Sequence, residues 1–210
     1  MDLGVKGKTF VIGGGSRGLG RGTANALVAD GARVLLLSRD QESVDRAVAE
    51  LGDAAIGVTG DMADPGTAAR VAAAVDANFS GKLDGLVINA GGPPAGKALD
   101  ITEEQWLGSY ELLIGGPLRM LKLLVPKMND GGAILFITST SVRQPVNNLD
   151  TSNVLRPGVT ALAKTLAIEL APRIRVNSLA PGRINTGCIR SQDKMRAEAQ
   201  GTTQKHAAEE

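Results

Sequence analysis

The sequence is poor in the residues that form disulfides, metal sites and aromatic binding surfaces. It has 210 residues, with one Cys, one His, one Trp, one Tyr and three Phe. A single cysteine (Cys188) excludes an internal disulfide, and a single histidine (His206) gives no metal-ligand cluster. The net charge of +1 and the few aromatic rings do not provide the basic, stacking surface that binds nucleic acid. We therefore expect no metal and no nucleic-acid partner.

Long apolar runs are also missing from the sequence. No segment reaches membrane-spanning length, and the first residues carry no charged-then-apolar targeting signal. Hydrophobic residues make up 43% and charged residues 21% of the chain, a balance typical of a globular protein. A chain of 210 residues can bury the core of one domain. We expect a cytoplasmic protein with no membrane partner.

The sequence does contain a regular alternation of short apolar segments and longer helical patterns. Several apolar segments are continuous, as in parallel strands that are covered on both faces. The alternation predicts an α/β fold with a Rossmann-type, doubly wound parallel sheet. Asp64–Pro65 is expected to begin the third helix, and Gly115–Pro117 to interrupt the fourth. The expected strands span 8–13, 33–38, 54–58, 84–89, 133–139 and 174–179, and the expected helices span 18–30, 41–51, 65–79, 102–128 and 152–171.

The most informative segment is the glycine-rich turn Gly13–Gly20, which lies between a strand and a helix. The unpaired amides and the positive dipole end at a helix start suit a pyrophosphate, and glycines let the phosphates approach closely. A glycine-rich turn alone would also fit an ordinary loop, but a second strand follows at βαβ spacing. We therefore predict a dinucleotide site. The residues of this turn expected at the cofactor are Gly14, Ser16, Arg17, Gly18 and Leu19.

The end of the second strand indicates which nicotinamide cofactor is bound. An NAD enzyme of this architecture usually has a carboxylate there, which accepts from the ribose 2′-OH. Here Ser38 and Arg39 take that place, and Asp40 follows as the expected cap of the next helix. Arg17 and Arg39 can converge on a 2′-phosphate, which guanidinium groups bind strongly. The pattern favours NADP(H) over NAD(H), the alternative being that both arginines are solvated surface charges.

Together these segments resemble the short-chain dehydrogenase/reductase family over nearly the whole chain. Three motifs, each at a strand end, carry the resemblance: the glycine turn, Ile88–Gly91 and Val176–Thr186. The resemblance implies an adenine contact after strand three, a ribose contact after strand four and a nicotinamide contact in the last motif. The carboxylate after strand three would otherwise be a loop or helix cap. The implied cofactor-binding residues beyond the glycine turn are Ser38, Arg39, Asp61, Met62, Asn89, Ala90, Gly91, Pro181, Gly182, Ile184 and Thr186.

The family reduces carbonyls with an Asn–Ser–Tyr–Lys tetrad, from which this sequence departs. Ser139 fits the serine, whereas Ser152, Arg156 and Leu113 occupy the tyrosine, lysine and asparagine positions. A serine hydroxyl is a far poorer acid than a phenol, and arginine does not give up its proton. Ser139, Ser152 and Arg156 are therefore the catalytic candidates, with a water that they order as proton donor. The alternative donor is the sole tyrosine, Tyr110, whose other role would be helix packing.

The segment 143–156 resembles a divergent branch of the family, similar to 3-oxoacyl-[acyl-carrier-protein] reductases without the tetrad. The resemblance implies NADP(H)-dependent hydride transfer with a small-molecule carbonyl or alcohol substrate. A nicotinamide-nucleotide-binding sensor or partner subunit, or a purely structural partner, is the alternative. Family members pair through two helices, here 102–128 and 152–171, which implies a homodimer or homotetramer.

The end of the sequence departs from the family as well. No strand pattern follows residue 187, so we expect either a truncated version of the family's fold or a sheet of six strands with an edge that needs covering. We expect residues 1–186 to form an NADP-binding Rossmann domain. Residues 187–210 are expected to form a polar lid or tail segment of the same domain.

Overall fold

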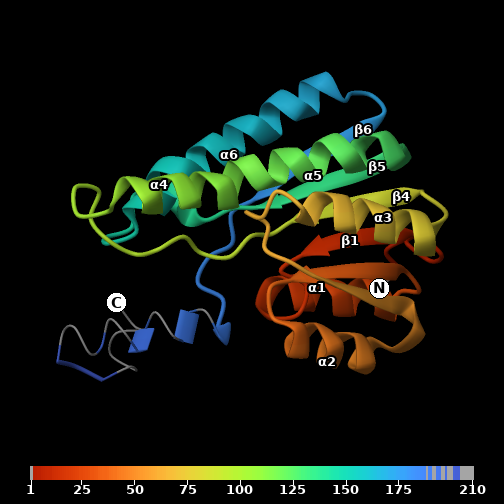
Figure 1. Ribbon diagram of the computed structural model, residues 1–210, viewed down its shortest axis with the longest axis horizontal. Helices are drawn as coiled ribbons and strands as arrows, with labels where there is room; N and C mark the ends of the chain where they lie inside the picture. The colour runs from red at the N-terminus through yellow and green to blue at the C-terminus, as the bar shows by residue number, and fades with distance from the viewer. Residues whose placement is uncertain (1, 188, 191–192, 195–196, 198–200, 204–210) are drawn as a thin grey trace.

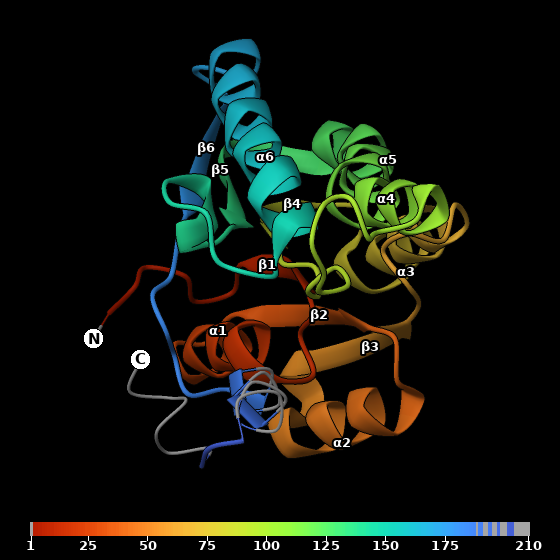
Figure 2. The same cartoon turned by 90° about the vertical axis from the view of Figure 1, so that its left-hand side faces the viewer.

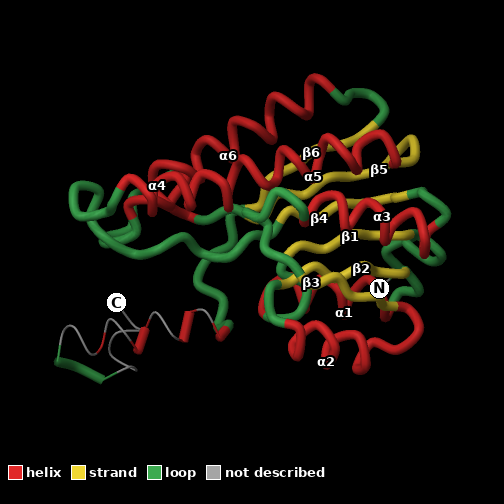
Figure 3. The backbone as a smooth tube through the Cα atoms, viewed as in Figure 1, coloured by secondary structure: helices red, strands yellow, loops and turns green. Residues whose placement is uncertain are grey.

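The computed structural model of the chain describes residues 2–187, 189–190, 193–194, 197 and 201–203. Its centre is a six-stranded sheet in which all neighbouring strands are parallel, in the order β3-β2-β1-β4-β5-β6 (Figures 1 and 3). The strand order reverses between β1 and β4, so the predicted Rossmann-type, doubly wound sheet is confirmed. The strands are β1 (Thr9–Gly13), β2 (Arg33–Ser38), β3 (Ala55–Thr59), β4 (Leu83–Ile88), β5 (Met128–Ile137) and β6 (Ile174–Leu179).

Helices lie on both faces of the sheet, as Figure 2 shows, with α1 and α2 on one face and α3, α5 and α6 on the other. Successive residues of a strand point to opposite faces of the sheet: Val11 packs with α3, α5 and α6, and Ile12 packs with α1 and α2. Burial on both faces is why consecutive strand positions are apolar. The helices are α1 (Gly18–Ala29), α2 (Gln41–Leu51), α3 (Thr67–Phe79), α4 (Glu103–Tyr110), α5 (Gly116–Leu124) and α6 (Asp150–Glu169).

The helical segment predicted over 102–128 is interrupted, as its Gly-Gly-Pro sequence indicated. A π-helical turn (Glu111–Gly115) separates α4 from α5, and a 3₁₀ turn (Val125–Lys127) leads into β5. Pro117 lies in the first turn of α5, directly after the π-helical turn. The interruption brings Leu112 to the carboxyl edge of the sheet, where it lines a cleft.

Several predicted boundaries were wrong, and the contacts explain two of them. β5 ends at Ile137 rather than at Ser139, because the Ser139 hydroxyl accepts from the Ser141 amide and turns the chain into a 3₁₀ turn (Thr140–Val142). Asp64 does not cap α3; its carboxylate accepts from the Gly66 amide at 3.0 Å, and the helix begins at Thr67. The last helix spans 150–169 rather than 152–171.

The apolar residues in and directly after α6, one of the two helices expected to pair copies of the chain, mainly pack inside the domain. Val159 is buried, and Leu155, Leu162, Leu166 and Leu170 pack against the core, whereas Val154 is 59% exposed. The outer strand β6 ends at Leu179, which is 52% exposed. Among the described residues, no helix is long and apolar enough to cross a membrane.

Much of the segment 187–210, including Cys188 and His206, lies outside the described residues, so the prediction of a lid or tail stays a prediction. Two of its described residues, Asp193 and Ala197, are buried. Asp193 pairs with Arg183, which lies between β6 and this segment. Within the described part of the chain, no group of three His, Cys, Asp or Glu is placed to hold a metal ion.

Candidate functional site

A cleft of about 200 Å³ opens at the carboxyl ends of β1, β2, β3 and β4. In open parallel sheets this edge, next to the point where the strand order reverses, is where ligands bind. Most residues predicted to bind the cofactor come together here. They are Gly14, Ser16, Arg17, Ser38, Arg39, Asp61, Met62, Asn89, Ala90 and Gly91.

The glycine turn is held tightly between the end of β4 and the start of α1. Asn89 donates from Nδ2 to the carbonyl of Gly13 at 3.1 Å, so the end of one strand fixes the turn after another. Gly14 has a φ of +60°, and a Cβ there would lie 2.7 Å from Nδ2 of Asn89. Arg17, at the N-cap of α1, makes no side-chain hydrogen bond to the helix. The first amides of α1 therefore lack a cap from this side chain, which is the arrangement that binds a phosphate.

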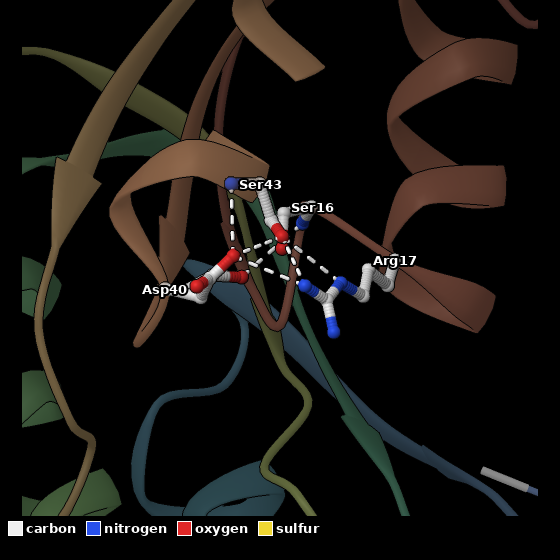
Figure 4. Close-up of polar contacts among 5 residues, drawn as sticks. Ser16, Arg17, Asp40 and Ser43 are labelled. Atoms are coloured by element: carbon white, nitrogen blue, oxygen red, sulfur yellow. Dashed lines mark hydrogen bonds and ion pairs between the residues drawn. The ribbon is translucent and has the colours of Figure 1, made fainter. Parts of the chain in front are cut away.

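Arg17 forms a compact polar network with the start of α2 (Figure 4). Asp40 caps α2, as predicted, by accepting from the Ser43 amide at 2.9 Å. Nη2 of Arg17 lies 3.0 Å from Oδ1 of Asp40, and its Nε donates to Oγ of Ser43 at 3.0 Å. Hydrogen bonds from the hydroxyl and the amide of Ser43, with the nearby Arg17 charge, lower the pKa of Asp40. The carboxylate is therefore ionised throughout the neutral range.

Arg39 approaches the same cleft from the end of β2. Its Nη1 lies 3.6 Å from Oδ2 of Asp61, and its side chain is 67% exposed. Asp61 also accepts from the Ala63 amide at 2.9 Å, which fixes the turn after β3. Both arginines predicted to meet a 2′-phosphate thus line one cleft, each beside a carboxylate. The sequence interpretation missed Leu37, Asp40, Gly60 and Leu112 as lining residues.

The other predicted cofactor residues lie elsewhere. Gly18, Leu19, Ile184 and Thr186 line a second cavity of about 770 Å³ along the outer side of α1, and Pro181 and Gly182 line neither cavity. The Thr186 hydroxyl accepts from the Ile189 amide at 3.4 Å. The structure therefore does not bring the segment 181–186 to the first cleft, and its contact with a nicotinamide carboxamide stays a prediction.

The catalytic candidates form a hydrogen-bonded chain in which one member had not been foreseen. Ser152 and Arg156 lie one turn apart on α6, and Nε of Arg156 donates to Oγ of Ser152 at 3.1 Å. Oγ of Ser152 also lies 3.2 Å from Oγ of Ser141, and all three side chains are buried. Ser139 joins this chain through Ser141, because its hydroxyl accepts a hydrogen bond from the Ser141 amide at 3.2 Å. The only sequence signal for Ser141 was its place in a run of hydroxyl residues after β5.

Arg156 links α6 to the end of β5. Its Nη1 lies 3.4 Å from the carbonyl oxygens of Ile137 and of Thr138, and the side chain is 9% exposed. A buried guanidinium is tolerated only when its donors find acceptors, as they do here. The alternative acid, Tyr110, is 42% exposed and lines neither cavity, and Leu113 is buried in the core. Arg156 thus fixes the backbone next to Ser139.

The segment 143–156 is folded back on itself beside this chain of hydroxyls. Asn153 accepts from the Val146 amide at 2.9 Å and donates to the Val146 carbonyl at 2.8 Å. Thr151 is fully buried and donates to the carbonyl of Pro94 at 2.9 Å, which ties α6 to the loop after β4. These contacts connect the loop that carries Gly91 with the helix that carries Ser152.

Comparisons with known proteins indicate the family of this chain. The family model described as "Enoyl-(Acyl carrier protein) reductase" matches residues 14–209. The human protein "Dehydrogenase/reductase SDR family member 4" is 39% identical over 191 residues, which cover 87% of this chain and 68% of that protein.

Solved structures are also similar to this one. L-sorbose reductase from Gluconobacter frateurii, complexed with NADPH and L-sorbose, has a TM-score of 0.91 and 31% identity, over 98% of this chain and 81% of that chain. A 3-ketoacyl-(acyl-carrier-protein) reductase from Brucella melitensis, complexed with NADH, has a TM-score of 0.81 and 30% identity, over 87% of this chain and 78% of that chain. With its six-stranded fold, its glycine turn and these similarities, the chain belongs to the short-chain dehydrogenase/reductase family.

Proposed function

We propose that the protein is an NADP(H)-dependent oxidoreductase that reduces a ketone or 3-oxoacyl-type carbonyl by hydride transfer. The observation that carries the proposal is the cleft at the strand ends, in which the glycine turn lies beside Arg17 and Arg39. Two guanidinium groups suit a ribose 2′-phosphate. The NADPH complex of L-sorbose reductase supports this choice, and the NADH complex of the Brucella reductase keeps NAD(H) as the alternative to test.

Calorimetric titration with NADPH and with NADH tests the cofactor assignment. Replacing Arg39 with alanine is expected to weaken NADPH binding by about 10- to 100-fold, because a charge-assisted contact with the phosphate is lost. NADH binding should change by less than about 2-fold, since NADH carries no 2′-phosphate. The matched control is Arg175→Ala, which removes the same charge from an exposed position on β6. An equal loss for both nucleotides would contradict the assignment of Arg39 to the phosphate.

The proposed chemistry divides roles among the hydroxyls after β5. The cofactor would supply the hydride when it is bound. The Ser139 hydroxyl would donate to the substrate carbonyl oxygen, and a water held by Ser139 and Ser152 would deliver the proton. Because Arg156 donates to Oγ of Ser152, it positions that hydroxyl rather than acting as an acid itself. This is the arrangement we assign to a divergent branch of the family that lacks the tyrosine and the lysine.

A screen of ketone and 3-oxoacyl thioester substrates with NADPH tests this chemistry. The Ser139→Ala variant is expected to lose about 10²- to 10³-fold in kcat, the usual effect of removing one donor to a developing oxyanion. Thr140→Ala is the control, because it removes an exposed hydroxyl from the adjacent residue of the same turn. A Ser139→Ala variant that is as active as Thr140→Ala would exclude Ser139 from the reaction.

A second candidate function is a nicotinamide-nucleotide sensor or partner subunit. The observation that favours it is the burial of Ser152 and Arg156: Arg156 donates to Ser152, and Ser152 in turn bonds to Ser141. Tight NADPH binding with no turnover in the substrate screen would select this function.

For either function we propose that two copies of the chain pair through α4 and α6, where Leu107 and Val154 are each 59% exposed.

A further inference from the structure

The turn after β3 and the π-helical turn after α4 both contribute residues to the cleft at the strand ends. Asp61 and Met62 line it from the first turn, and Leu112 lines it from the second. The turn after β3 takes its shape from a local bond, in which Asp61 accepts from the Ala63 amide at 2.9 Å. Such a bond fixes the shape of a turn but not its position relative to other elements. The position of Met62 relative to Leu112 is therefore set by contacts between elements.

One side chain of α5, that of Arg119, contacts both turns through the same atom. Its Nη2 donates to the Ala63 carbonyl at 2.9 Å and lies 2.7 Å from Oε2 of Glu111. Ala63 is the neighbour of Met62 in the chain, so the first contact lies one residue from the cleft. Glu111 is likewise the neighbour of Leu112. Because a guanidinium is planar and rigid, Arg119 holds the two turns at a fixed distance from each other.

Two glycines where the π-helical turn meets α5 make room for these contacts. A Cβ on Gly116 would lie 1.9 Å from the Met62 carbonyl oxygen, and a Cβ on Gly115 would lie 2.5 Å from Oε2 of Glu111. A side chain at either position would therefore displace one of the two turns or the carboxylate from Arg119. The side chains of Arg119 and Glu111 are 31% and 42% exposed, so water and salt screen their attraction only in part.

We propose that Arg119, held by Glu111, is a positioning residue for recognition of the nucleotide base, because it keeps the turn with Asp61 and Met62 at the cleft. The proposal rests on the proposed function, since it requires that the cleft bind a nicotinamide nucleotide. The Asp61 carboxylate can accept from the 6-amino group of adenine, whereas hypoxanthine has an oxygen at that position. The preference for adenine over hypoxanthine therefore reports where the turn lies.

The test is the Arg119→Met variant, titrated calorimetrically with NADPH, with NADH and with the reduced NADP analogue in which hypoxanthine replaces adenine. Methionine keeps an unbranched apolar side chain but donates no hydrogen bond. The wild-type protein should bind NADPH more tightly than the analogue. In the variant, NADPH and NADH should each bind about 3- to 10-fold more weakly, because a hydrogen bond to the base is lost. The analogue, which forms no such bond, should weaken by less than about 2-fold.

The matched control is Arg173→Met. Arg173 also joins elements through backbone carbonyls, donating to those of Met128 and Val125 at 2.9 Å and 3.3 Å, but it lines neither cavity. Both variants should unfold at a lower urea concentration than the wild-type protein, and only Arg119→Met should change the preference between the two bases. Glu111→Gln provides a milder variant: it removes the charge that holds Arg119 and should reduce this preference by about 2-fold.

Three results would overturn the proposal. They are a wild-type protein that binds NADPH and the hypoxanthine analogue equally, an unchanged preference in both Arg119→Met and Glu111→Gln, and an equal loss of preference in Arg173→Met. Wild-type protein that binds none of the three nucleotides would instead show that the proposed function has failed, and the inference would fall with it.

Discussion

Replacing Gly20 with alanine is expected to weaken the binding of NADPH and NADH by at least about 100-fold. A Cβ at this position would lie 2.3 Å from the carbonyl oxygen and 2.7 Å from the carbonyl carbon of Gly14. These are backbone atoms of the glycine turn, which cannot rotate away as a flexible side chain would. The start of α1 must therefore move away from the turn, and the amides that face the expected pyrophosphate move with it. The same crowding should lower the free energy of unfolding by about 2 kcal/mol.

The control for this variant lies two residues further along α1. A Cβ on Gly22 would meet no atom within 4 Å, so Gly22→Ala should raise the free energy of unfolding by about 0.5–1 kcal/mol through helix propensity. Urea unfolding and calorimetric titration of both variants provide the measurement. Similar behaviour of the two variants would show that α1 does not pack closely on the glycine turn.

Elements bounded by local signals could be predicted to the residue. The strand 33–38 and the helix 41–51 coincide with β2 and α2, because Asp40 caps the helix and Gly52, with a φ of +67°, follows it. The strand 174–179 also coincides with β6. In these places the sequence contains both the apolar pattern and the residues that end it.

Elements that depend on distant contacts could not be predicted to the residue. The first part of β5 is polar and glycine-rich, and it becomes a strand because Met128 pairs with Leu83 and Gly132 with Ile174. The helix α6 begins two residues early, and its first turn contains Thr151, which bonds to Pro94 in the loop after β4. Neither partner can be identified from the local sequence.

The candidate site likewise contains residues that the sequence could place and contacts that it could not. Residues at the strand ends, such as Arg39, Asp61 and Asn89, could be placed in one cleft because the order of parallel strands brings their carboxyl ends together. The pairing of Arg17 with Asp40 could not be predicted, since the sequence pattern already explains Asp40 as the cap of α2. The Ser141 link to Ser152 arises from packing between the turn after β5 and α6.

Replacing Gly116 with alanine is expected to destabilise the fold more than the Gly20 substitution does. A Cβ at this position would lie 1.9 Å from the carbonyl oxygen of Met62 and 2.7 Å from its carbonyl carbon. Only glycine lets α5 approach the turn after β3 so closely. The approach is reinforced by Arg119 of α5, whose Nη2 donates to the Ala63 carbonyl at 2.9 Å.

The Gly116→Ala substitution should therefore lower the free energy of unfolding by about 3 kcal/mol, since either the helix or the turn must shift. It should also weaken nucleotide binding, because Asp61 and Met62 on that turn line the cleft. Gly108→Ala in α4 is the control: a Cβ there meets no atom within 4 Å, and the change should stabilise the helix by about 0.5–1 kcal/mol. Urea unfolding compares the two variants. A Gly116→Ala protein as stable as Gly108→Ala would contradict the close packing of α5 on the turn after β3. It would also contradict our expectation that this packing positions the residues of that turn which line the cleft.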